Sequence, residues 1–294
     1  MIKKILKIVF VLLLIPAIYF GKIFYKQYQD HFERKAYRES LVDTSTPTVS
    51  VLRDTVLIDY QNDKRTLHVY VPPDYGSDTS KHYPVIYLMD GESAFNDLEF
   101  MGPEWQVDEM INEAHAEGRS TAIVIGVNQA DDRDPEYLPY AIKECPHAHG
   151  DKFAEWMASD LKTWVDENYR TLPDPESTTI GGISLSGMMA YYMVMKFPDV
   201  YGNALIQSPS MWTSYRELFS LELTQKQLEF KKIFVSVGEE EGGNMVPHAK
   251  DVYRKFKKQG LDEDQLRIEI IEDEGHYHTT WRKSFALAYP WLMD

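Results

Sequence analysis

Three groups of residues have the chemical types, and the order along the chain, that nucleophilic catalysis requires. Ser184 lies in the glycine-rich segment GGISLSGMM, residues 181–189; three glutamates follow at 239–241, and two histidines stand at 276 and 278. A serine hydroxyl becomes a nucleophile when a histidine takes its proton, and a carboxylate orients that histidine. The order serine, acid, histidine therefore predicts a site that attacks carbonyl carbon.

The surroundings of Ser184 predict a sharp turn from a strand into a helix. Residues 177–183 (STTIGGI) have strand character, and the residues from Gly187 onward (GMMAYYMVMKF) are typical of a helix. In the signature G-x-S-x-G the nucleophile occupies such a turn, and small neighbours let the strand and helix approach closely. Gly182 meets this requirement, whereas Ser186 replaces the second glycine with the next smallest choice. The alternative is that Ser184 only caps the following helix; the strand-turn-helix context favours the nucleophile.

The acid is expected just after the apolar run KKIFVSVG, residues 231–238. In hydrolases whose nucleophile lies at such a strand-to-helix turn, the acid commonly lies three residues beyond the glycine that ends its strand. This spacing selects Glu241. Glu239 and Glu240 are then expected to be solvated neighbours, and they remain the alternatives.

His276 is the expected general base. It follows the run QLRIEIIED and Gly275, so its loop can fold back towards Ser184, whereas His278 already belongs to the start of the final helix. The segments DEGHYH and HAH also offer metal ligands, but neither has a complete set at a motif spacing, so we predict no metal and no cofactor.

An oxyanion formed on the substrate needs two backbone N–H donors. The residue after the nucleophile, Leu185, is expected to supply one. The other is expected from the segment MDGES, where Gly91 permits a close backbone approach and Glu92 is the candidate donor.

Eight β-rich runs, alternating with helical patterns, predict the scaffold. The first two, residues 55–60 and 65–73, resemble an antiparallel pair that Pro72-Pro73 ends. The other six are continuously apolar, as strands covered on both faces are, and they are residues 83–91, 120–128, 178–184, 204–210, 231–238 and 265–273. This order predicts an α/β-hydrolase fold with a mostly parallel eight-stranded sheet and helices on both faces. A dinucleotide-binding fold is disfavoured because no G-x-G-x-x-G follows an early strand.

Composition sets further limits. The 294 residues are 44% hydrophobic, enough for one large α/β core. The net charge of −15 disfavours nucleic acid as a partner, and Cys145, the single cysteine, excludes an intrachain disulfide.

The N-terminus predicts export. Three lysines (Lys3, Lys4, Lys7) precede an apolar run over residues 8–21, and residues 5–25 approach the length of about 20 residues that a membrane span needs. We expect residues 1–25 to be a signal anchor rather than a cleaved signal peptide, residues 26–46 a polar stalk, and residues 47–294 the catalytic domain. The expected location is the cell envelope or periplasm, with an anchor in the inner membrane.

Taken together, these motifs resemble the esterase family that contains esterase D and the enterochelin esterases. The resemblance extends from about Leu67 to the C-terminus, and its segments are YPVIYLMDGESAF, NQADDRDPEYLPY, GDKFAEWMASDLKTWVDENYRT, GGISLSGMMA, SPSMWTS, VGEEEG and EGHYHTTWRKSFALAYPWL. It implies the same serine, histidine and acid. It also implies that Arg133, Tyr137 and Trp212 lie near the pocket mouth, although Trp212 is equally compatible with a loop anchor.

The expected function is a serine carboxylesterase that hydrolyses an ester of a small acyl group or of an acylated sugar or siderophore-type substrate. The alternatives are a siderophore trilactone esterase, an acyltransferase, and an inactive interaction module with the same fold.

Overall fold

The computed structural model describes residues 35–100 and 102–293 of the protein. The chain divides into two units, Met1–Asp43 and Thr44–Asp294. Within the first unit, residues 35–40 are helical. Among the helices of the described residues, none combines the length and the apolar composition that crossing a membrane requires. The predicted anchor, residues 1–25, lies outside the described residues, and the predicted domain limits stay a prediction.

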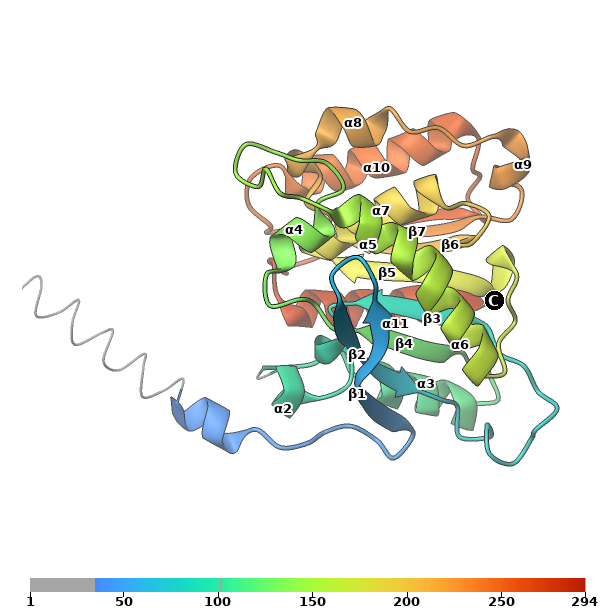
Figure 1. Ribbon diagram of the computed structural model, residues 1–294. Coiled ribbons are helices and arrows are strands. Elements are labelled where there is room, and N and C mark those ends of the chain that lie inside the picture. Colours follow the sequence, from blue (N-terminus) through green and yellow to red (C-terminus); the bar gives the residue numbers. More distant parts are fainter. Residues whose placement is uncertain (1–34, 101, 294) are drawn as a thin grey trace, which may run out of the picture. The chain divides into compact units, whose positions relative to one another are not determined.

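The second unit is built on one eight-stranded sheet, with the strand order β1-β2-β4-β3-β5-β6-β7-β8 (Figure 1). The strands are β1 (Val49–Ile58), β2 (Asp63–Tyr70), β3 (Val85–Met89), β4 (Ile123–Val127), β5 (Thr178–Ile183), β6 (Asn203–Gln207), β7 (Lys232–Gly238) and β8 (Leu266–Ile271). β2 runs antiparallel to both β1 and β4, and the remaining neighbours pair in parallel. The predicted antiparallel start and parallel remainder are confirmed.

Helices cover both faces of the sheet. One face packs against α5 (Gly150–Trp156), α6 (Lys162–Asn168), α7 (Ser184–Lys196) and α10 (Met245–Gln259). The other face packs against α3 (Val107–Ala116) and α11 (His278–Met293). The central strands β3, β4 and β5 are buried along their whole length, which explains why their sequences are continuously apolar rather than alternating.

Shorter helices lie around this framework. They are α2 (Asp97–Phe100), α4 (Arg133–Tyr137), α8 (Tyr215–Phe219) and α9 (Gln225–Leu228). Between α5 and α6 the helical backbone continues through a π-helical turn at Met157–Leu161. Met157 and Leu161, one such turn apart, both remain fully buried.

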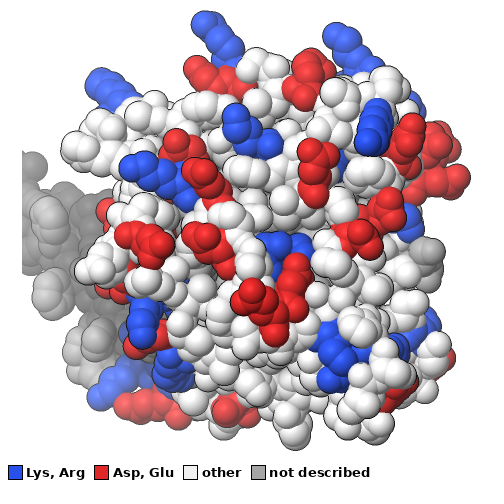
Figure 2. All heavy atoms as spheres, turned by 45° about the vertical axis from the view of Figure 1, so that its right-hand side comes forward, with Lys and Arg blue, Asp and Glu red and all other residues white. Residues whose placement is uncertain are grey.

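Acidic and basic side chains are interspersed over the face of the molecule in Figure 2, and no continuous basic patch crosses it. This face therefore offers no surface of the kind that binds a nucleic-acid backbone.

Candidate active site

Ser184 occupies the turn between β5 and α7. Its backbone is left-handed, with φ of 55°, a conformation that costs free energy in a residue with a side chain and is often found at active sites. A Cβ added to Gly182 would lie 2.4 Å from the backbone oxygen of Ser186, so only glycine fits where the strand meets the helix. The elbow expected from the sequence is therefore present, even though its second glycine is absent.

The structure brings Ser184, His276 and Glu241 together. Ser184 Oγ lies 3.0 Å from His276 Nε2, and His276 Nδ1 lies 2.8 Å from Glu241 Oε2. The three side chains come from the ends of β5, β7 and β8, which adjoin the same edge of the sheet because the intervening strands are parallel. They form a continuous hydrogen-bonded chain from the hydroxyl to the carboxylate.

Glu241 is the member of the three-glutamate run that points inward. Its other oxygen, Oε1, accepts hydrogen bonds from Ser208 Oγ at 2.5 Å and from the backbone N–H of Gly238 at 2.8 Å. Glu239 and Glu240 are exposed to solvent. Both oxygens of Glu241 are thus held by donors, which fixes the orientation of the carboxylate towards His276.

His278 lines the same cleft as His276, two residues further along the chain, where it is the first residue of α11. Burial, aided by the nearby charge of Arg282 and by His276, lowers the pKa of His278 to about 4, so this ring is neutral at physiological pH. The edge of its ring packs against Trp281.

Ser186 joins the elbow to the end of β3. Its fully buried hydroxyl accepts a hydrogen bond from the backbone N–H of Ile183 at 2.8 Å and donates one to Asp90 Oδ2 at 2.6 Å. Arg133 in turn binds Asp90 through two parallel bonds, Nε to Oδ1 at 2.9 Å and Nη2 to Oδ2 at 2.6 Å. Two-bond pairs of this kind are among the stronger side-chain contacts in proteins. The serine that replaces the expected glycine is therefore part of a connected polar network.

Of the expected oxyanion donors, Glu92 lines the cleft that contains Ser184, and Gly91 and Leu185 directly follow two of its lining residues, Asp90 and Ser184. Leu185 is in the first turn of α7, where backbone N–H groups have no acceptor within the helix. Gly91 and Glu92 form the short helix η1 (Gly91–Ser93) directly after β3. A Cβ at Gly91 would lie 2.2 Å from the carbonyl carbon of Gly126, so this loop approaches β4 closely.

The side chain of Glu92 lines the same cleft as Ser184. It accepts a hydrogen bond from the backbone N–H of Gln129 at 3.2 Å. Burial, together with the neighbouring charge of Asp90, raises the pKa of Glu92 to about 7. The group therefore changes charge near neutral pH, beside the nucleophile.

Ser184, His276 and Glu92 are among the residues that line a cleft of about 300 Å³. Arg133 lines it, as the resemblance implied, but its guanidinium is occupied by Asp90. Tyr137 differs from the expectation: it is fully buried, and its hydroxyl accepts a hydrogen bond from the backbone N–H of Asp90 at 3.3 Å, so it supports the site from below. Trp212 also differs, because it is 64% exposed and is not among the residues that line this cleft.

Sequence reasoning missed three residues that follow the ends of β3 and β6. Asp90 and Ser208 have left-handed backbones, with φ of 59° and 46°, and each contacts a predicted site residue or its neighbour through a side chain. Ser210 places its hydroxyl 3.3 Å from Ser184 Oγ. Their one signal in the sequence is their position immediately after buried strands, at the edge of the sheet where Ser184 lies.

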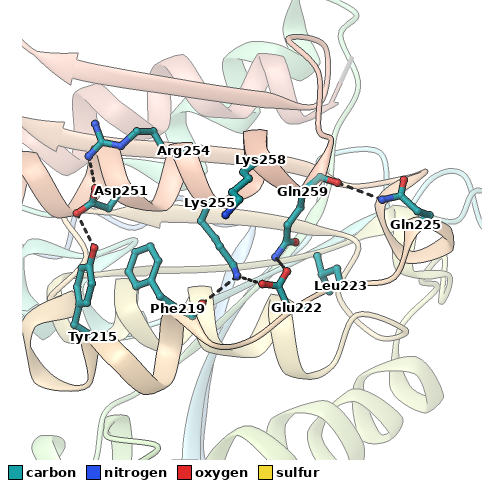
Figure 3. A pocket seen from close by; sticks show the side chains of 10 residues that line it. All are labelled: Tyr215, Phe219, Glu222, Leu223, Gln225, Asp251, Arg254, Lys255, Lys258 and Gln259. Atoms are coloured by element: carbon teal, nitrogen blue, oxygen red, sulfur yellow. Dashed lines mark hydrogen bonds and ion pairs between the residues drawn. The ribbon is translucent and has the colours of Figure 1, made fainter.

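A larger cleft of about 570 Å³ lies elsewhere, between α8, α9 and α10 (Figure 3). Two basic side chains that line it form ion pairs, Arg254 with Asp251 and Lys255 with Glu222. None of the residues predicted for catalysis lines it. The larger of the two clefts is therefore not the one that contains Ser184 and His276.

Known proteins resemble this chain over most of its length. The family model described as putative esterase matches residues 59–292. The uncharacterized protein YbbA of Bacillus subtilis is 25% identical and covers 80% of this chain and 95% of its own length. The ferri-bacillibactin esterase BesA of the same organism is 25% identical and covers 74% of this chain and 81% of its own.

Solved structures share the fold. The BES protein from Bacillus cereus aligns with a TM-score of 0.66 at 21% identity, over 85% of this chain and 96% of that one. The enterobactin esterase FES from Shigella flexneri aligns with a TM-score of 0.61 at 15% identity, over 85% of this chain and 60% of that one. The family match, which spans nearly all of the second unit, establishes that the chain belongs to the putative esterase family and is a carboxylic ester hydrolase.

Proposed function

We propose that the protein hydrolyses carboxylic esters through a covalent acyl-enzyme, with Ser184 as nucleophile, His276 as general base and Glu241 as the acid that orients the histidine. The observation that carries this proposal is the continuous hydrogen-bonded chain, 3.0 Å from Ser184 Oγ to His276 Nε2 and 2.8 Å from His276 Nδ1 to Glu241 Oε2.

The reaction follows from the positions of these groups. His276 Nε2 takes the proton from Ser184 Oγ as the oxygen attacks the ester carbonyl carbon. The protonated imidazole, stabilised by Glu241, returns this proton to the departing alcohol, which leaves an acyl group on Ser184. A water deprotonated by the same histidine then releases the carboxylic acid. An alcohol in place of water would give acyl transfer, which is the related alternative.

The negative oxygen of the tetrahedral intermediate is assigned to the backbone N–H groups of Leu185 and Glu92. The position of Leu185 at the start of α7 supports the first assignment, because its N–H belongs to the unpaired end of the helix. The position of Glu92 beside the cleft supports the second.

The substrate is proposed to be an uncharged ester of a small acyl group or of an acylated sugar. Among the described residues that line the cleft, Arg133 is the one lysine or arginine, and its charge is neutralised by Asp90. Glu92 adds a negative charge above neutral pH. This charge pattern favours neutral substrates over anionic ones.

A siderophore trilactone is the second candidate substrate. Its support is the similarity to BesA, named as a ferri-bacillibactin esterase, over 81% of that protein. Comparing turnover of short p-nitrophenyl esters, acetylated sugars and a catecholate trilactone distinguishes the two classes. Exclusive turnover of the trilactone would overturn the proposed preference for neutral esters.

We also propose that the protein is located in the cell envelope. The lysines and the apolar run within residues 1–25 support export to the cell envelope with retention in the membrane. Fractionation of cells that express the full chain, compared with a chain that lacks residues 1–25, tests this. Recovery of both proteins in the same cytosolic fraction would contradict it.

A fluorophosphonate probe tests the mechanism, because it reacts with an activated serine. The full-length protein should be labelled, Ser184→Ala should not be, and ester turnover should fall by about 10⁴-fold or more in that variant. Ser210→Ala is the matched control, since it removes a hydroxyl only 3.3 Å from Ser184 Oγ and should still be labelled. A folded wild-type protein that fails to react would refute the serine mechanism.

A further inference from the structure

Three carboxylates converge at the beginning of α3, outside the proposed active site. They belong to Glu104, Asp108 and Glu109, and one ligand oxygen from each lies within 4.8 Å of the others. Glu104 and Asp108 are almost completely buried, at 1% and 0% exposure. Three acidic side chains in one buried place repel one another, so their arrangement requires a compensating positive charge or bound protons.

Each carboxylate has an oxygen that no protein donor satisfies. Glu104 Oε2, Asp108 Oδ1 and Glu109 Oε2 are buried and lack hydrogen-bond partners. The opposite oxygens are held in place: Thr44 Oγ1 donates to Glu104 Oε1, and the backbone N–H and hydroxyl of Thr46 both donate to Asp108 Oδ2 at 2.7 Å. Two of the carboxylates are thus oriented by threonines while one oxygen of each is left open.

No lysine or arginine within the described part of the chain pairs with these carboxylates. Arg282 approaches Glu104 from α11, but its guanidinium donates to the backbone carbonyl of Glu104, with Nε at 3.0 Å, and not to the carboxylate. The N-terminus of α3 contributes at most about half a positive charge. Together these contributions leave most of the charge of three ionised carboxylates uncompensated.

We propose that Glu104, Asp108 and Glu109 bind a hard divalent cation, with Ca²⁺ as the reference ion. Carboxylate oxygens are the ligands that Ca²⁺ prefers, at about 2.3–2.6 Å, so two ligands of one ion lie at most about 5 Å apart. The separation of the three oxygens, within 4.8 Å, meets this condition. No nitrogen or sulfur ligand belongs to the cluster, which disfavours zinc and copper. Water molecules would complete the coordination.

The competing state is protonation of the same carboxylates. Burial, with help from neighbouring carboxylates, raises the pKa of Glu104 to about 7 and the pKa of Glu109 to about 8. A bound cation displaces these protons. Protons and the cation therefore compete for the same oxygens, and the affinity for the cation is expected to fall as the pH is lowered.

The cation would join parts of the chain that are far apart in sequence. Thr44 and Thr46 precede β1, the carboxylates border α3, and Arg282 connects the Glu104 carbonyl to α11, which begins at His278. A structural role follows, in which binding stabilises the second unit near the segment that carries His276.

The test uses the full-length protein after treatment with a chelator. Isothermal titration with Ca²⁺ at concentrations up to about 1 mM should show one saturable site, and saturation should raise the melting temperature by several degrees. Tb³⁺ should bind in the same place and emit on excitation of tryptophan, since Trp105 adjoins Glu104. Mg²⁺ and Mn²⁺ should compete with Ca²⁺ for the same site.

The decisive variant is Glu109→Gln, which keeps the shape of the side chain and removes one charge. It should lower the affinity for Ca²⁺ by about tenfold or more, and it should raise the melting temperature in chelator because it relieves repulsion. Glu113→Gln, an exposed position on the same helix, is the matched control and should bind as the wild type does. Asp108→Asn removes the charge of a second ligand and should also weaken the binding of Ca²⁺.

Two results would overturn the proposal. If none of the four cations, Ca²⁺, Tb³⁺, Mg²⁺ and Mn²⁺, binds saturably to the wild type, the carboxylates hold protons instead. If Ca²⁺ binds Glu109→Gln and Asp108→Asn as tightly as the wild type, its site lies elsewhere. Neither result depends on ester turnover, so both are independent of the proposed catalytic mechanism.

Discussion

Replacement of Ser186 by alanine tests whether the serine at the elbow is a tolerated substitute for glycine or a structural part of the site. Its fully buried hydroxyl connects the Ile183 N–H, at 2.8 Å, with the Asp90 carboxylate, at 2.6 Å. Ser186→Ala removes both hydrogen bonds at once and leaves the N–H without this partner.

The magnitude follows from these two contacts. A hydrogen bond to a charged group contributes about 1.5–3 kcal/mol, and a buried donor left unsatisfied costs about 1–3 kcal/mol. The two contributions overlap because relaxation or a water molecule recovers part of the loss. We expect Ser186→Ala to lower the free energy of unfolding by about 3 kcal/mol. Ser186→Gly should lose at least as much, although it restores the usual signature, because it lacks the same hydroxyl.

Urea unfolding followed by tryptophan fluorescence measures this loss, provided that the dependence on denaturant is unchanged. Ser93→Ala is a matched control: its hydroxyl is also fully buried and donates to the backbone carbonyl of Asp90 at 2.7 Å, but that bond is neutral. It should cost about 1 kcal/mol. A loss in Ser186→Ala no larger than that in Ser93→Ala would refute the role assigned to the charged network.

Three further predictions concern the residues around Ser184. Arg133→Ala should lower the free energy of unfolding by about 3 kcal/mol, because it leaves the buried carboxylate of Asp90 without its two-bond partner; Arg133→Lys should recover part of this loss, and equal losses would contradict the importance of the paired geometry. His276→Ala should lower kcat/KM by about 10³-fold or more, whereas His278→Ala should change it by less than about tenfold; the reverse ranking in esterase assays would assign the base to His278. Glu92 has a raised pKa of about 7, so its carboxyl is neutral below that pH and negative above it. The negative form opposes the developing oxyanion, and kcat should therefore fall above about pH 7 in the wild type but not in Glu92→Gln; identical pH profiles would exclude this effect.

The order of the strands along the chain could be predicted from the sequence, because the strands that are buried are also the segments with the most apolar composition. Strands that are covered on both faces, such as β3, β4 and β5, are continuously apolar, and this pattern survives in a single sequence. The positions of Ser184, Glu241 and His276 relative to their strands followed from the same pattern. The strands β5, β7 and β8 belong to one run of parallel strands, whose carboxyl ends meet at the same edge of the sheet, so residues just beyond them come close together.

The side-chain contacts between the ends of these strands could not be predicted from the sequence. Nothing local in the segment MDG indicates that Asp90 adopts a left-handed backbone and contacts Ser186, which is 96 residues away. The same holds for Ser208, whose hydroxyl binds Glu241. Tyr137 and Trp212 were expected to have similar roles, yet one is fully buried and the other is 64% exposed. Burial depends on the neighbours that packing supplies, and the chemical type of a side chain does not determine them.

The sequence by itself determined the class of fold, the elbow at Ser184 and the order of the three predicted catalytic groups, because each depends on short-range patterns of hydrophobicity and turn formation. Only the tertiary structure decided which oxygens and nitrogens meet. It showed that Ser186 belongs to a network with Asp90 and Arg133, and it gathered three carboxylates at the start of α3. Such contacts join residues from different elements, and their distances are set by how the helices pack against the sheet.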